Sequence, residues 1–297
     1  MKNILFNKFY KKFNILSSIL IIISLILLLF KGLNFGVDFK GGTLIEIRTD
    51  QKSNNITLIR DSLKQINLGD ISVKSFGSEI DFIIKIEKQD SNNPKFIDNI
   101  KLKLSNSIGY VDFRRVEKVG PKVSSELLRS GIIAIGLSLA AMLLYIWIRF
   151  EWQFSLGAIL ALFHDVILTL GIFSLFSLEI NLSIVAAVLT IVGYSMNDTV
   201  VIFDRVRENL RKHSDIKIFE LTNISINETL SRTIITSVTT LLALLSIYFF
   251  GGEILKGFSL AMILGVIFGT YSSIFIANPV LVFLKVSQKT ILKEDKN

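Results

Sequence analysis

Ionisable side chains interrupt three consecutive apolar runs of this sequence. The pair His164–Asp165 lies in one run, Asp198 in the next, and Arg232 at the start of the third. A charge inside a lipid-spanning segment costs roughly 2.5–3.5 kcal/mol or more, so such residues are expected to have a function. Burial and a nearby opposite charge act on a carboxylic acid in opposite directions, so such an acid can be balanced between its protonated and ionised forms. These residue types therefore point to proton transfer.

Helical spacing places the polar residues around Asp198 in one stripe. Tyr194, Asp198 and Val201 share a helix face, and Ser195 and Asn197 lie beside it. We expect this stripe to face a polar neighbour rather than lipid.

The following apolar run supplies a matching stripe, in which Arg232, Thr236 and Thr239 recur at helical spacing. The two runs are consecutive and antiparallel, and both charges lie in the same half of the membrane. We therefore expect Asp198 and Arg232 to face each other, with Ser195, Asn197, Thr236 and Thr239 as a supporting polar seam.

Two interpretations of these charges stay open. In the functional one, Asp198 takes up and releases a proton under the influence of Arg232. In the structural one, the two residues form an ion pair that only locks two helices together. His164 and Asp165 are either a further relay element or residues that cap and hydrate a break in their helix, whereas His213 is expected to be solvated.

The composition explains why these runs should cross a membrane. The chain has 297 residues, 51% of them hydrophobic, and its mean hydropathy is +0.55. The apolar residues are concentrated in blocks of about 18 residues or more, the length that spans a bilayer as a helix. This pattern excludes a soluble enzyme, a disordered chain and an outer-membrane barrel, whose strands would alternate.

Six such blocks are expected to form transmembrane helices. The first follows four lysines and could be a signal peptide, but it is long and no small-x-small cleavage site follows it, so we expect it to be retained. The predicted spans are 13–30, 130–148, 154–178, 180–203, 231–250 and 257–284. In the last of them, Gly265 and Gly269 form a small-xxx-small pair typical of helix packing.

Short basic segments predict the orientation. Residues 1–12, 204–230 and 285–297 are rich in Lys and Arg, so they are expected in the cytoplasm, with 204–230 as a basic loop or amphipathic helix. Residues 31–129 would then form an extracytoplasmic (periplasmic) domain. The chain has no Cys, which excludes disulfides and thiolate metal sites.

Residues 31–129 read as a small α+β domain. The apolar spacing predicts the order β-α-β-β-α-β, a ferredoxin-like arrangement, with a hairpin turn at Gly77–Ser78 and a helix start near Pro94. It has no cluster of His and Asp at ligand spacing and no Ser-His-Asp set, so a binding role is expected. The predicted strands are 43–48, 70–76, 81–87 and 110–116, and the predicted helices are 57–66 and 95–106.

Motifs for ATP hydrolysis and metalloprotease chemistry are absent from the sequence. Any work must therefore come from a partner or an ion gradient. One charge crossing the membrane yields about 2.3 kcal/mol per 100 mV, enough to drive a conformational cycle. We expect no enzyme activity, no metal and no cofactor, with protons as the coupling ion.

Several motifs resemble the bacterial SecF family of protein translocase subunits, within the RND superfamily. The fourth-span motif is the most specific, and the resemblance covers about residues 10 to 285. The motifs are Asn34-Phe-Gly-Val-Asp-Phe-Lys-Gly-Gly-Thr, Val119-Gly-Pro-Lys-Val-Ser, Gly193-Tyr-Ser-Met-Asn-Asp-Thr-Val-Val-Ile-Phe-Asp-Arg-Val-Arg-Glu-Asn, Arg232-Thr-Ile-Ile-Thr-Ser-Val-Thr-Thr and Phe250-Gly-Gly-Glu.

The resemblance implies a six-helix RND-type bundle with a small outside domain, in the bacterial inner membrane with both termini cytoplasmic. It implies SecD as the partner that completes a twelve-helix unit, association with the SecYEG channel, and indirect cooperation with SecA. YajC and YidC are further implied partners, and a translocating unfolded preprotein is the implied cargo. The proton motive force would promote late-stage export after ATP-driven translocation.

The family's proton-pathway residues match Asp198 and Arg232, and Asp165 is a further candidate. Some relatives are fused SecD–SecF chains, whereas this sequence has only the SecF half, so the resemblance implies that it does not act alone. Two alternatives remain: a stand-alone RND-type exporter of lipids or small molecules, and an intramembrane aspartyl protease using Asp165 and Asp198. The small outside domain argues against the first, and a nearby Arg against the shared proton of the second.

Overall fold

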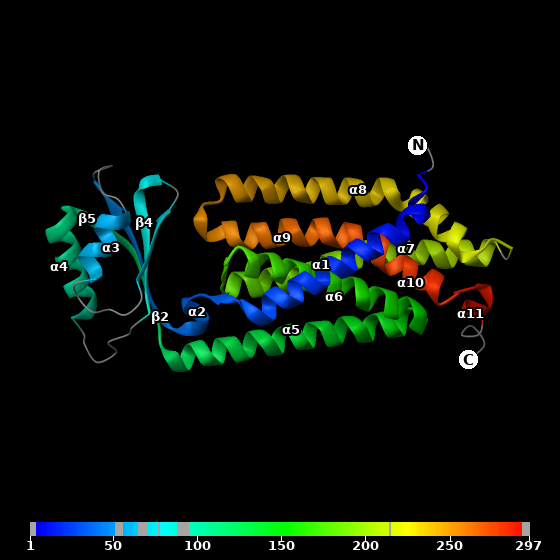
Figure 1. Ribbon diagram of the computed structural model, residues 1–297, viewed down its shortest axis with the longest axis horizontal. Coiled ribbons are helices and arrows are strands. Elements are labelled where there is room, and N and C mark those ends of the chain that lie inside the picture. The colour runs from blue at the N-terminus through cyan, green and yellow to red at the C-terminus, as the bar shows by residue number, and fades with distance from the viewer. Residues whose placement is uncertain are drawn as a thin grey trace.

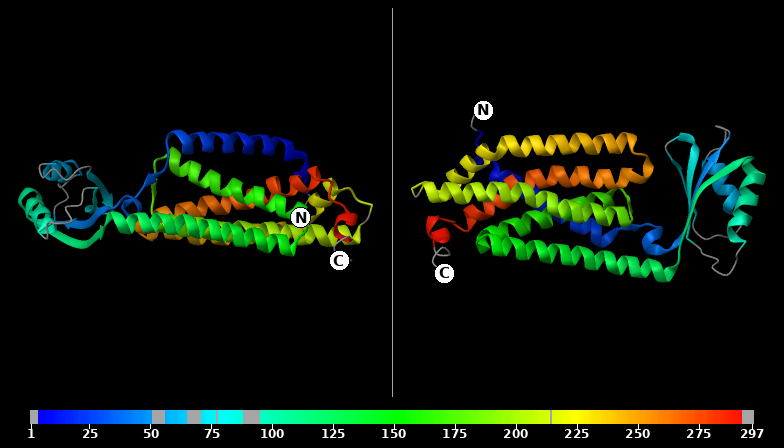
Figure 2. Two further views of the ribbon diagram at one scale, coloured as in Figure 1. Left: turned by 90° about the horizontal axis from the view of Figure 1, so that it is seen from below. Right: turned by 180° about the vertical axis from the view of Figure 1, so that it is seen from behind.

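A computed structural model describes residues 4–50, 56–64, 71–76, 78–87, 95–213 and 215–292. The molecule has two parts, an elongated helical bundle and a small α+β domain at one end of it, which we call the outer domain (Figure 1). The first and last described residues lie at the opposite end of the bundle, as the further views also show (Figure 2).

Among the described residues, six helices are long and apolar enough to cross a membrane, in agreement with the predicted number of spans. The last of them, α9, continues through a π-helical turn, η2, into α10. The bundle elements are η1 (Phe6–Phe9), α1 (Tyr10–Phe30), α5 (Pro121–Arg149), α6 (Trp152–Leu175), α7 (Leu182–Lys212), α8 (Ile218–Phe250), α9 (Glu253–Ser272), η2 (Ser273–Ala277), α10 (Asn278–Phe283) and α11 (Gln288–Leu292).

The helices divide into an inner and an outer set. In α6, α7 and the α9–α10 helix, half or more of the most apolar stretch is buried, whereas in α1, α5 and α8 the buried share is 11–17%. A polar residue on the buried face of an inner helix therefore contacts protein, while most of the surface of an outer helix is left for lipid or a partner.

The largest differences between the observed and the predicted helix bounds are in two places. The segment 204–230 was predicted as a basic loop or amphipathic helix. It consists of the helical ends of α7 and α8 with a short connection between them, so the helical alternative is the correct one. The reason is that Val206 and Leu210 on α7 and Leu221 on α8 are fully buried, so the two helices continue to pack beyond the apolar run. In addition, α5 begins at Pro121, nine residues before the predicted span, because proline is favourable in the first helical turn.

The outer domain has the predicted element order, and its sheet confirms the ferredoxin-like arrangement. The strand order is β3-β4-β2-β5 and every neighbouring pair is antiparallel. Gly77 and Pro94, predicted as a turn and a helix start, lie outside the described residues. The elements are β2 (Gly42–Thr49), α3 (Ile56–Lys64), β3 (Ile71–Phe76), β4 (Ser78–Ile86), α4 (Phe96–Ile108) and β5 (Val111–Val119).

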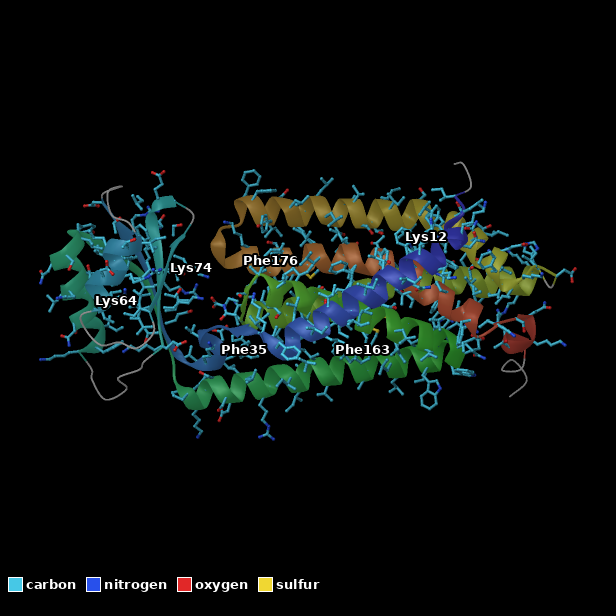
Figure 3. The ribbon with its side chains drawn as sticks, viewed as in Figure 1. Lys12, Phe35, Lys64, Lys74, Phe163 and Phe176 are labelled. Carbon is cyan, nitrogen blue, oxygen red and sulfur yellow. The ribbon has the colours of Figure 1, made fainter. Side chains whose placement is uncertain are left out.

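The two helices of the outer domain cover the face of the sheet that is turned away from the bundle (Figure 1). Ile45, Ile84 and Leu104 are fully buried between sheet and helices. The other face of the sheet looks toward the bundle, where Figure 3 labels Lys74, while Lys64 lies on the far side. The domain's core is therefore separate from the core of the bundle.

A short connection joins the two parts and was not predicted. It consists of β1 (Asn34–Phe35) and α2 (Val37–Lys40), and β1 pairs in parallel with β6 (Glu179–Ile180), which lies between α6 and α7. Figure 3 labels Phe35 at this connection.

Candidate functional site

Asp165 lies in the middle of α6 and is fully buried. Its Oδ1 is 2.8 Å from Nδ1 of His164, and its Oδ2 accepts hydrogen bonds from the hydroxyls of Ser195 at 2.5 Å and Ser272 at 2.8 Å. Side chains from α6, α7 and α9 therefore meet at this carboxyl group. Helix α6 is continuous here, so the hypothesis that His164 and Asp165 cap a break in the helix is wrong.

His164 extends this cluster toward α1. Its ring stacks on Tyr271, with the centroids 5.7 Å apart. The Tyr271 hydroxyl donates to the backbone carbonyl of Phe13 at 3.0 Å and is 2.7 Å from the Ser17 hydroxyl. The His164 Nε2 atom is buried and has no hydrogen-bond partner among the described residues. Only one of the two ring nitrogens of His164 therefore has a hydrogen-bond partner there.

Asp198 lies on the inward face of α7 and is 3% exposed. Hydroxyls of Ser237 on α8 and Thr270 on α9 flank its carboxyl group and are 2.7 Å from each other. Within the described parts of the chain, Asp198 Oδ2 has no hydrogen-bond partner. An ionised carboxylate without a full set of partners is costly in such a place, so the energy of this site depends on whether the group carries a proton.

Close packing of α9 against α7 brings these groups together. A Cβ atom on Gly265 would lie 2.2 Å from Cγ1 of Ile191, so only glycine allows this approach. This agrees with the packing role predicted for Gly265 and Gly269. Past this contact, Thr199 and Ser273 place their hydroxyls 2.8 Å apart at the start of the π-helical turn η2. Such turns are frequent at functional sites.

Arg232 does not lie where the sequence analysis placed it. It is exposed on α8, and in the part of the chain that the structure describes no hydrogen bond or ion pair joins it to Asp198. Its positive charge still acts on Asp198 from a distance. The expectation that the two side chains face each other directly is therefore wrong for this conformation.

The supporting seam is also only partly as predicted. Ser195 is buried and binds Asp165, but Asn197 and Thr239 are exposed and Thr236 is partly exposed. The hydroxyls of Thr236 and Thr239 donate to backbone carbonyls of their own helix, those of Arg232 and Ile235. They therefore need no partner on another helix.

The inward face of α8 is a different stripe, formed by Thr233, Ser237 and Leu244. Sequence reasoning missed Ser237 and its partner Thr270 on α9, and it also missed Ser272, which donates to Asp165. The available signal was weak, because serine and threonine occur on both faces of α8 and each can satisfy itself locally.

A different ion pair joins α7 to α8. Arg205 on α7 donates to Glu228 on α8 at 2.7 Å, and Asn209 donates to the same carboxylate at 2.7 Å. This pair joins α7 and α8 beyond Asp198, toward the end of the bundle away from the outer domain. A structural ion pair between the two helices therefore exists without Asp198.

The arrangement does not resemble a catalytic pair of aspartates. Asp165 and Asp198 have separate hydroxyl partners, and no hydrogen bond between them is found in the described ranges. A protease dyad shares one proton by direct contact. No group of three or more His, Asp or Glu residues able to hold a metal occurs among the described residues either. The site therefore consists of two separate buried carboxyl groups, each with its own hydroxyl neighbours.

Comparison with known families gives two matches. Residues 100–287 match the family "Protein export membrane protein SecD/SecF, C-terminal", and residues 26–53 match the SecD/SecF GG motif. Similar proteins include the protein translocase subunit SecF of Rickettsia bellii, 50% identical over 266 residues and 88% of each chain. The SecF subunit of Cereibacter sphaeroides is 44% identical over 92% of this chain and 87% of its own.

Solved structures give the same picture. The crystal structure of SecDF, a translocon-associated membrane protein from Thermus thermophilus, has a TM-score of 0.85 and 34% identity over 95% of this chain. SecDF in its super-membrane-facing form has a TM-score of 0.72 and 32% identity over all of this chain. The chain spans 39% and 40% of these two longer chains.

Proposed function

The chain belongs to the SecF family of protein translocase subunits, and from this premise we propose that it promotes late-stage protein export by using the proton motive force. It does so with SecD and the SecYEG channel, after SecA has driven translocation with ATP. The multi-pass helical fold suits this role. The inner membrane is the proposed location, with 31–129 outside and 204–230 and both termini in the cytoplasm.

The observation that carries the proton coupling is the environment of Asp198. Its carboxyl group is buried among hydroxyls from two other helices, and Oδ2 lacks a partner among the described residues. Gaining or losing a proton changes the cost of keeping this group buried by several kcal/mol. Helices α7, α8 and α9 can therefore favour different packing in the two protonation states.

Asp165 and Arg232 have different proposed parts. Asp165 is held by Ser195 and Ser272 and is a second proton acceptor next to His164. Arg232 lies on the exposed face of an outer helix, where a second six-helix subunit can cover it. We infer that its charge acts on Asp198 most strongly in the assembled complex with SecD.

The decisive test is export by cells or spheroplasts that carry Asp198→Asn. Asparagine keeps the shape of the side chain but cannot ionise. We expect normal membrane levels and normal copurification with SecD, but an export rate that no longer responds to an uncoupler. Asp204→Asn is the matched control, because this acid is on the same helix but is exposed and paired with Arg149.

Two outcomes would contradict the proposal. If Asp198→Asn keeps the uncoupler-sensitive part of export, protons do not act through this residue. If the purified chain works without SecD and moves lipids or small molecules, the stand-alone exporter is the better description.

Orientation has its own test, because the chain contains no native Cys. Ser107→Cys on α4 and His213→Cys beyond α7 place single thiols at exposed positions. We expect an impermeant maleimide added to intact spheroplasts to label the first and not the second. The reverse pattern would overturn the proposed orientation.

A further inference from the structure

The start of α7 is held by the connection that leads from α1 into the outer domain. β1 and β6 pair in register, with Asn34 opposite Glu179 and Phe35 opposite Ile180. The Gly36 N–H donates to the Ile180 carbonyl at 2.8 Å. Two segments more than 140 residues apart in the sequence thus form one small sheet between the bundle and the outer domain.

Asp38 extends this contact to the helix itself. Its Oδ2 accepts a hydrogen bond at 2.9 Å from the backbone N–H of Leu182, the first residue of α7. Asn181 accepts from the N–H of Ile184 at 3.2 Å. The first turn of α7 therefore has two caps, one from Asn181 directly before the helix and one from Asp38 on α2. A carboxylate is favourable here because the N-terminal end of a helix carries partial positive charge.

A third contact comes from the sheet of the outer domain. Lys85 on β4 forms an ion pair with Glu179 of β6, and both side chains are about a fifth exposed (20% and 21%). Gly36 packs against the same carboxylate, since an added Cβ would lie 2.5 Å from its Oε1. Glu179 is thus enclosed by the sheet on one side and by β1 on the other.

This contact lies at the other end of the helix segment that carries Asp198. From Leu182 to Asp198 the helix is continuous, a length of roughly 24 Å. Only Asn181 separates β6 from α7, so no flexible linker can absorb a movement of the helix. A shift of α7 at Asp198 must therefore displace β6. With β6 it also displaces β1 and the ion pair to Lys85 on β4.

We propose that Asp38, Lys85 and Glu179 are positioning residues that transmit movement of α7 to the outer domain. They form a rigid contact, here called the junction, that lets the protonation of Asp198 move the sheet of the domain. This inference rests on the proposed function, because it assumes that α7 moves with proton occupancy. A domain attached only by flexible chain would be insensitive to that movement.

The test of the junction is a charge swap in the full-length protein, expressed with SecD. Glu179→Lys and Lys85→Glu each place two like charges in contact, whereas the double variant restores an ion pair with the charges exchanged. We expect the uncoupler-sensitive export rate to fall at least five-fold in each single variant. In the double variant we expect it to recover to at least half of the original rate.

A matched control uses the exposed pair Arg114 and Asp112 on β5, which lies 3.8 Å apart in the same domain. Arg114→Glu and Asp112→Arg should leave export unchanged. Hydrogen exchange of β2 and β4 peptides checks that the domain is folded in every variant. If the single variants export normally, or if the swap does not recover export, the junction has no positioning role.

A reversible disulfide gives a second, independent measurement. Phe35→Cys and Ile180→Cys place thiols on opposed residues of β1 and β6. Because the junction is proposed to act as a rigid contact, oxidation should leave gradient-driven export unchanged. Loss of export on oxidation that returns on reduction would show that the junction opens, and would overturn the inference.

Asp198→Asn run in parallel separates the two proposals. If it has no effect, the proposed proton coupling fails. If it abolishes the uncoupler-sensitive rate while the junction variants export normally, the coupling stands and the junction does not carry it.

Discussion

Two buried aspartates, one in the outer domain and one in the bundle, differ in how fully their carboxylate oxygens are hydrogen-bonded. Asp81 on β4 is 7% exposed and is held by both arms of the Arg48 guanidinium, at 2.6 and 2.7 Å, and by the Ser78 hydroxyl at 2.8 Å. Asp198 is 3% exposed, and among the described residues its Oδ2 has no partner. The first acid is fully satisfied in its ionised form, and the second is not.

The difference extends to the surroundings of each acid. The outer domain packs an apolar core between its sheet and two helices, and its buried acid Asp81 is paired with Arg48. The bundle places His164, Asp165 and several hydroxyls among its inner helices. The outer domain therefore gains stability by burying apolar side chains. The bundle instead buries polar groups, which costs stability, as expected of a site that changes state.

The largest expected effect on stability is in the domain core. Leu104→Ala removes a fully buried side chain from α4 and should lower the free energy of unfolding of the outer domain by about 2–5 kcal/mol. Hydrogen exchange of α4 and β2 peptides in the full chain measures it. Leu102→Ala, 63% exposed on the same helix, is the control. Equal effects of the two substitutions would contradict the conclusion that the outer domain gains its stability from burial.

The next effect is on export and concerns Arg232 and Asp198. We expect Arg232→Ala to lose most of the uncoupler-sensitive export rate, as Asp198→Asn does, and the double variant to be little worse than either. Such non-additivity indicates one shared interaction. Arg232→Lys should recover export only in part, because lysine lacks the planar guanidinium. Additive defects would show that the two residues act separately, in line with their separation in this conformation.

A smaller effect distinguishes the two faces of α8. Ser237→Ala removes a hydroxyl beside Asp198, and the loss of one hydrogen bond of about 0.5–1.5 kcal/mol predicts a reduction of roughly two- to ten-fold in the uncoupler-sensitive rate. Thr236→Ala removes a hydroxyl that bonds only its own helix and should have no effect. The opposite result would favour the seam predicted from the sequence.

The smallest effect is the acid response of the outer domain. The hydrogen bonds from the Arg48 guanidinium hold the pKa of Asp81 below its usual range. A lowered pKa in the folded state contributes stability above the unfolded value of about 3.9, and this contribution is lost as the pH falls through the folded value. Lower protection of the β4 amides, measured relative to their intrinsic exchange rate at each pH, is therefore expected only below about pH 4, and Asp81→Asn should abolish this dependence. A transition near neutral pH would contradict it.

The local sequence pattern was sufficient to predict much of the fold. The six membrane helices follow from the length of the apolar runs, because a bilayer requires about 20 residues per helix. The order of the outer domain follows from switches between two-residue and 3.6-residue periodicity, and every predicted strand and helix was found within a few residues. Burial of Asp198 and Asp165 follows equally from their positions inside apolar runs.

Only tertiary packing decided which partners these acids receive. The sequence alone cannot choose between Thr236 and Ser237, since both are hydroxyls one residue apart and a rotation of α8 by about 100° exchanges them. The rotation is set by contacts among α7, α8 and α9, such as Gly265 against Ile191.

The same holds for the junction. The pairing of Asn34 with Glu179 joins segments separated by α2, the six elements of the outer domain and two long helices, and a two-residue strand has no periodicity to detect. Local sequence therefore determined the membrane helices, the six elements of the outer domain and the burial of Asp165 and Asp198. Tertiary structure decided which faces meet, because helix rotation and long-range pairing depend on atoms far away in the chain.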